Sequence, residues 1–85
     1  MPNTPSKVEK QQVLIITFAN TTQAMTMEEK CQAYHLPGEL IPVPRAIKAS
    51  CGLAWRTVPE QKEILSQMMK KERIKAEKVV LYPMK

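Results

Sequence analysis

A chain of 85 residues, of which 44% are hydrophobic and 25% charged, carries enough apolar surface for one modest core and not for two. Its longest apolar run, Val13 to Ile16, is far shorter than the ~20 residues of a membrane-spanning helix, and the N-terminal residues lack the apolar stretch of a secretory signal. We therefore expect a cytoplasmic protein without a membrane span.

The net charge of +5 comes largely from a basic cluster over residues 70–78, near which Tyr82 is the one aromatic side chain. Basic residues without interleaved aromatic residues are typical of a solvated helix face, so we expect no nucleic-acid partner.

The chain has two cysteines, Cys31 and Cys51, and one histidine, His35. Two cysteines do not make the disulfide framework of a small secreted domain, and we expect both to be free thiols. A structural zinc site takes four Cys or His ligands, which exceeds this set. The sequence therefore predicts no metal and no cofactor.

The first half of the chain predicts a tail, a strand and a helix. Residues 1–11 contain two prolines and no apolar periodicity, which is typical of a flexible tail, so that one domain spans residues 12–85. Residues 13–19 are nearly all apolar and rich in β-branched side chains, as in a strand buried on both faces. Residues 20–22 offer helix N-caps, and the helical spacing of the apolar residues that follow places Cys31 on the inner face of a helix ending near Pro37 and Gly38.

The second half predicts two further strands, a helix and a closing strand. Pro42 and Pro44 make residues 39–45 an edge strand or extended loop, because proline lacks the donor that a central strand needs. Residues 51–56 alternate as a third strand, residues 58–60 open a helix with Ile64, Leu65 and Met68 inside, and residues 78–82 form the last strand. The order β-α-β-β-α-β predicts an α+β, ferredoxin-like two-layer sandwich with the first and third strands central.

Residues 40–56, LIPVPRAIKASCGLAWR, carry more polar and reactive side chains than a hairpin connection requires. The thiolate is the reactive form of cysteine, and nearby cations favour it. Arg45, Lys48 and Arg56 flank Cys51, with no acidic residue between Glu39 and Glu60, so the sequence predicts a uniformly positive surrounding.

We expect Cys51 to be exposed at the mouth of the turn that precedes the third strand. Ser50 is a candidate hydrogen-bond donor to the sulfur, and Gly52 permits either positive φ or the close approach of another molecule. The alternative is that Cys51 is a half-buried strand residue and Gly52 marks a bulge.

The string LIPVPR followed by SCGLAWR resembles the signature of the selenium/sulfur carrier-like family, and the resemblance extends over most of residues 12–82. The motif positions that carry over are Pro42, Pro44, Arg45, Ser50, Cys51, Gly52 and Arg56. The residue after the arginine is commonly acidic in the family and is Ala46 here, and Trp55 stands where a smaller aliphatic residue is usual.

The resemblance implies a thiol carrier rather than a self-sufficient enzyme. Cys51 would accept sulfur or selenium from a donor such as a cysteine desulfurase, hold it as a persulfide-type adduct and pass it to an acceptor protein. Two alternatives stay open. In one, the edge strand with Pro42 and Pro44 docks a partner and Cys51 is incidental. In the other, Cys31 and Cys51 form a redox pair, which the core position predicted for Cys31 disfavours.

Overall fold

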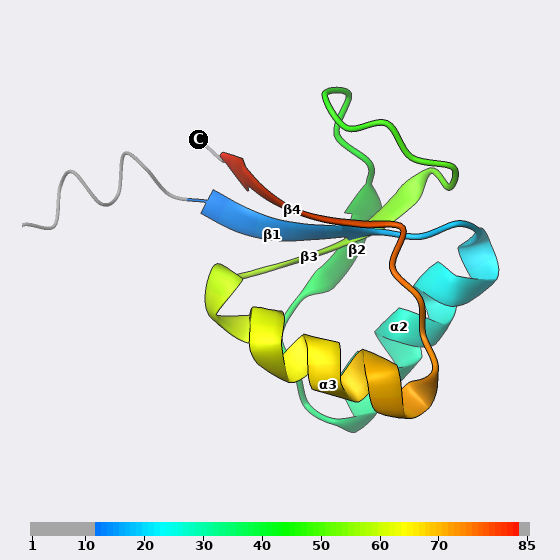
Figure 1. Ribbon diagram of the computed structural model, residues 1–85, viewed down its shortest axis with the longest axis vertical. Coiled ribbons are helices and arrows are strands. Elements are labelled where there is room, and N and C mark those ends of the chain that lie inside the picture. Colours follow the sequence, from blue (N-terminus) through cyan, green and yellow to red (C-terminus); the bar gives the residue numbers. More distant parts are fainter. Residues whose placement is uncertain (1–11, 84–85) are drawn as a thin grey trace, which may run out of the picture.

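Over residues 12–83, which the structure describes, this computed structural model has two helices on one face of a four-stranded antiparallel sheet (Figure 1). The elements are β1 (Gln12–Thr17), α2 (Thr21–Ala33), β2 (Glu39–Pro42), β3 (Leu53–Thr57), a 3-10 turn η1 (Pro59–Gln61), α3 (Lys62–Glu72) and β4 (Lys78–Pro83). The predicted α+β class is confirmed. The order of the elements differs from the predicted β-α-β-β-α-β in that the 3-10 turn η1 stands before the second helix. The predicted tail, residues 1–11, lies outside the described residues.

The strands are ordered β2-β3-β1-β4, so β1 and β3 are central and β2 and β4 are edges, as predicted. β1 holds its central position because it is apolar on both faces, and Leu14 to Thr17 are all buried. Pro42 ends the edge strand β2, where its missing N–H costs no ladder hydrogen bond.

The core lies between the sheet and the helices. Leu14, Ile16 and Trp55 supply the sheet side, and the helices add Ala24, Met27 and Cys31 from α2 and Leu65, Met68 and Met69 from α3. Asn20 caps α2 by accepting a hydrogen bond of 2.9 Å from the Gln23 N–H. The predicted inner position of Ile64 is wrong, since the side chain is 50% exposed. Ile64 is turned about 100° around the helix axis from its buried neighbour Leu65 and therefore faces solvent.

A tight passage connects α2 to β2. Gly38 has φ of 140°, and a Cβ built on it would lie 2.5 Å from Nε1 of Trp55. Trp55 is buried at 2% exposure, so the glycine allows the backbone to run directly against the indole ring. This contact fixes where β2 meets β3.

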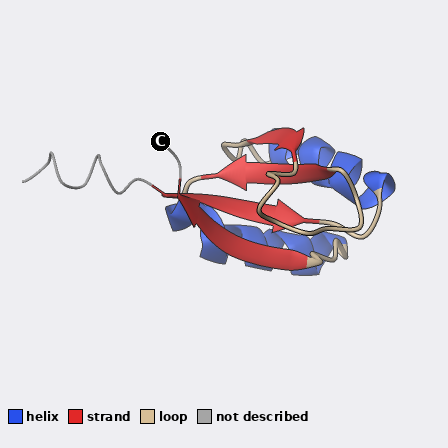
Figure 2. Cartoon of the chain, turned by 90° about the horizontal axis from the view of Figure 1, so that it is seen from above, coloured by secondary structure: helices blue, strands red, loops and turns tan. Residues whose placement is uncertain are grey.

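Residues 43–52, which we call the strap, connect β2 to β3 on the face of the sheet opposite the helices (Figures 1 and 2). The Val43 N–H donates to the Gly52 carbonyl at 3.0 Å, which closes the base of the strap. Its far end reaches the start of β4, where the Lys78 ammonium donates to the Lys48 carbonyl at 2.5 Å. The strap therefore spans the sheet from β2 to β4.

Candidate functional site

Cys51 lies at the end of the strap, two residues before β3. Its position has the same alternation as Leu53 and Trp55, so its side chain turns toward the helices and joins the core. Cys51 is only 6% exposed. The predicted exposed cysteine is therefore wrong for this conformation, because the start of α2 covers the place that the sequence left open.

The sulfur of Cys51 has two polar neighbours. The Leu53 N–H donates to Sγ at 3.4 Å, and the Thr21 hydroxyl lies 3.8 Å from it. Thr21 is the first residue of α2, a helix of 13 residues, so the sulfur lies beside a partially positive helix terminus. Helix N-termini and backbone N–H groups are places where proteins stabilise reactive thiolates. The sequence indicated the helix start, but nothing local connected it with Cys51.

None of the three predicted cations is among the polar contacts of the sulfur. Arg56 forms an ion pair with Glu39 across β2 and β3. It lies in β3, five residues after Cys51, at a backbone separation of up to ~16 Å at ~3.3 Å per residue. Arg45 and Lys48 are exposed on the strap, and the sulfur's polar contacts come from Thr21 and Leu53 instead.

Ser50 points to a carboxylate rather than to the thiol. Its N–H donates to Oε1 of Glu77 at 3.0 Å, and its hydroxyl donates to Oε2 at 2.6 Å. The hydroxyl first, and then the N–H, holds the pKa of Glu77 below its ordinary value. The predicted uniformly positive surrounding is therefore wrong, since folding brings in an acid from outside the segment.

Gly52 does not need a glycine-only conformation, because its φ lies outside the left-handed region. A Cβ at Gly52 would meet no atom within 4 Å. The positive φ expected as one role of Gly52 is therefore wrong, and the close approach of another molecule stays a prediction. Pro42 is exposed and pairs with Leu53 in the sheet, and Pro44 is half-buried in the strap, so both lie at the same end of the sheet as Cys51.

Cys31 is fully buried in α2, which confirms its predicted packing role. Burial raises the pKa of the Cys31 thiol to about 11. It lies ten residues after Thr21 in the helix, or ~15 Å along the axis, whereas Thr21 touches the sulfur of Cys51. A disulfide needs Cα atoms about 4.4–6.8 Å apart, so a Cys31–Cys51 pair is incompatible with this arrangement.

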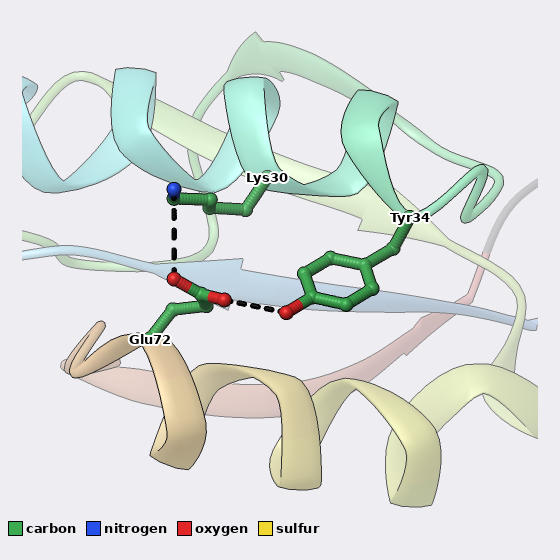
Figure 3. A network of polar contacts seen from close by, with 3 residues as sticks. All are labelled: Lys30, Tyr34 and Glu72. Carbon is green, nitrogen blue, oxygen red and sulfur yellow. Dashed lines mark hydrogen bonds and ion pairs between the residues drawn. The ribbon is translucent and has the colours of Figure 1, made fainter.

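A second polar cluster joins the two helices (Figure 3). Glu72 of α3 accepts a hydrogen bond of 2.5 Å from the Tyr34 hydroxyl and lies 3.5 Å from the Lys30 ammonium. The hydrogen bond raises the pKa of Tyr34 and lowers that of Glu72. These groups are satisfied by one another, which gives the cluster a structural role.

Two further properties of the described chain bear on the class of site. Within residues 12–83 no three His, Cys, Asp or Glu residues come together in a way that could hold a metal ion. The described helices also lack the length and apolar character that crossing a membrane requires.

Comparison with known proteins assigns the chain to a family. The family model described as "Putative Se/S carrier protein-like" matches residues 13–81, and the chain belongs to this family. Comparisons with curated proteins and with solved structures gave no match.

Proposed function

We propose that the protein carries one sulfur or selenium atom on Cys51, as a persulfide-type adduct, from a donor such as a cysteine desulfurase to an acceptor protein. The observation that carries this proposal is the setting of the sulfur, which accepts the Leu53 N–H at the N-terminus of α2. A backbone N–H and a helix N-terminus are groups with which proteins hold reactive cysteines, and family membership supports the same role.

The transfer needs one nucleophile and no oxidant. The Cys51 thiolate attacks the outer sulfur of a persulfide on the donor, and a new S–S bond forms to Cys51. The donor's own S–S bond breaks, and its electron pair leaves on the donor cysteine as a thiolate. The outer sulfur keeps its proton, so Cys51 ends as Cys–S–SH without net oxidation. The second transfer repeats these steps with an acceptor thiolate or other nucleophile.

The docking surface that we propose surrounds the mouth of the site. Arg45 and Lys48 project from the strap, and the Lys78 ammonium lies against the Lys48 carbonyl, which gives this end exposed cations to attract a negatively charged partner. Pro42 and Pro44 supply apolar contact at the same end. Gly52 is exposed and has open space where a Cβ would stand, which leaves room for a partner to contact the strap next to Cys51.

Two broader assignments accompany this function. We propose the ferredoxin-like class for the sandwich, supported by two central strands, two edge strands and helices on one face. We also propose a cytoplasmic location, where thiols stay reduced and available for transfer.

The test is intact-mass spectrometry after incubation with a cysteine desulfurase and free cysteine. Wild type and Cys51→Ser are compared, with Cys31→Ala as the matched control at the other thiol. We expect wild type and Cys31→Ala to gain the mass of one sulfur atom and Cys51→Ser to gain none. Parallel incubation with selenocysteine identifies the preferred cargo. No gain in any protein, with an active desulfurase, would contradict the proposal.

The burial of Cys51 favours one alternative, an interaction module that docks partners through the β2 edge. In that case Cys51→Ser would keep its partner in a binding assay, and substitution of Pro42 and Pro44 would release it. A carrier shows the opposite dependence in a sulfur-transfer assay.

A further inference from the structure

Cys51 presents a geometric problem for any transfer reaction. A donor persulfide must come within bonding distance of the sulfur of Cys51, a residue that is only 6% exposed and whose sulfur lies 3.8 Å from the Thr21 hydroxyl. The strap, which contains Cys51, must therefore move before the thiol can react. The contacts that hold the strap decide how readily this happens.

The contact nearest to Cys51 is the pair of hydrogen bonds between Ser50 and Glu77. Ser50 is the residue directly before Cys51, and both its N–H and its hydroxyl donate to the one carboxylate. Glu77 is itself anchored, because its N–H donates to the Thr17 carbonyl at 2.7 Å and β4 begins at the next residue. The carboxylate thus fastens the residue before Cys51 to the backbone at the start of β4.

On the other side of Cys51 the Gly52 carbonyl accepts a hydrogen bond from the Val43 N–H at 3.0 Å, so the bond that can turn is the Gly52 N–Cα bond, between Cys51 and that carbonyl. Gly52 carries no side chain, is exposed, and has empty space where a Cβ would stand. A rotation there would swing Cys51 away from Thr21 without disturbing β3, which starts at Leu53. One side of Cys51 is thus held by Glu77, and the other side is a hinge.

We propose that Glu77 is a positioning residue for Cys51: through Ser50 it keeps the thiol buried, and its release brings the thiol to the surface. The proposal rests on the proposed function for its biological meaning, because a carrier must shield its cargo between partners and expose it to them. A partner that binds the strap would compete with Glu77 and open the site at the moment of transfer. The lowered pKa of Glu77 keeps the carboxylate charged at neutral pH, so the fastening is present there.

The test measures how fast each cysteine is alkylated by iodoacetamide in the folded protein. Trypsin cleavage after Lys and Arg places Cys51 in the peptide of residues 49–56 and Cys31 in the peptide of residues 31–45, so both rates come from one digest. Cys31 is fully buried in the core and reports global unfolding, whereas Cys51 reports movement of the strap.

The variants are Glu77→Ala, Glu77→Gln and Ser50→Ala, with Glu63→Ala on the exposed start of α3 as the matched control. Glu77→Ala removes both hydrogen bonds to Ser50; because these bonds are solvent-exposed, we expect their combined loss to speed Cys51 alkylation by roughly tenfold, with Cys31 unchanged. Glu77→Gln should fall between wild type and Glu77→Ala. Hydrogen exchange at the Ser50 amide should accelerate in parallel.

Three results would overturn the proposal. Cys51 could react in wild type as fast as in an unstructured peptide of residues 49–56. Its rate could be the same in wild type, Glu77→Ala and Ser50→Ala. The variants could speed Cys31 and Cys51 together, which would mean global loosening. Because alkylation requires no donor protein, these outcomes are independent of whether sulfur is carried.

Discussion

The two glycines of the chain allow a matched test of the fold, because alanine should have opposite effects at the two positions. At Gly38 the new Cβ would lie 2.5 Å from Nε1 and 2.6 Å from two ring carbons of Trp55, on a backbone with φ of 140°. At Gly52 the new Cβ would meet no atom within 4 Å, and φ is outside the left-handed region.

The magnitudes follow from these geometries. Gly38→Ala adds a strained backbone conformation, which costs about 1–3 kcal/mol, to an overlap with a buried ring, which costs about 1–3 kcal/mol. The sum of about 2–6 kcal/mol is a large part of the roughly 4–13 kcal/mol expected for 85 residues. Gly52→Ala should be neutral or stabilise by up to about 1 kcal/mol, because it restricts the unfolded chain.

The assay is thermal and urea unfolding followed by circular dichroism and by the fluorescence of Trp55, the only tryptophan. A loss of 1 kcal/mol lowers Tm by roughly 4–8 °C in a domain of this size, so Gly38→Ala should melt at least about 8 °C below Gly52→Ala. Equal Tm values for the two variants would refute the close approach of Gly38 to the indole ring.

Three other predictions concern the remaining contacts. Tm should fall as pH rises from 9 to about 11, because in this range the Cys31 thiol ionises in the unfolded chain before it ionises in the folded protein. The fall should be smaller in Cys31→Ala, which has no thiol at this position. Glu72→Gln should lower Tm by only a few degrees, since its contacts with Lys30 and Tyr34 are solvent-exposed. Thr57→Val should cost about 1–2 kcal/mol in urea unfolding, because its hydroxyl donates to the Pro37 carbonyl at 2.8 Å in a buried place.

The arrangement of the sheet could be predicted because local signals agreed with one another. Residues 13–17 are apolar on both faces, which requires a central strand, and Pro42 restricts the segment that carries it to an edge. The spacing that placed Cys31 inside α2 worked for the same reason, since a helix face depends on neighbouring residues. The second helix differs from the prediction at its start, where η1 precedes α3 and Ile64 turns outward.

The surroundings of Cys51 could not be predicted, because they come from distant parts of the chain. Thr21 and Glu77 follow β1 and precede β4 in the chain, and the pairing of these strands places both residues beside the strap, with which no local pattern connects them. Proximity in sequence was misleading for Arg56, because an extended strand carries it away from Cys51 and its charge pairs with Glu39. The motif singles out Cys51 as the candidate reactive residue but contains no information on the groups that fold around it.

The most direct measurement is the position of the transferred atom. Wild-type protein is loaded with a cysteine desulfurase and free cysteine, its free thiols are alkylated, and the tryptic peptides are analysed by mass spectrometry. The account predicts one additional sulfur atom on the peptide of residues 49–56, which contains Cys51, and none on that of residues 31–45, which contains Cys31. Additional sulfur on the Cys31 peptide, or on neither peptide while the desulfurase is active, would contradict it.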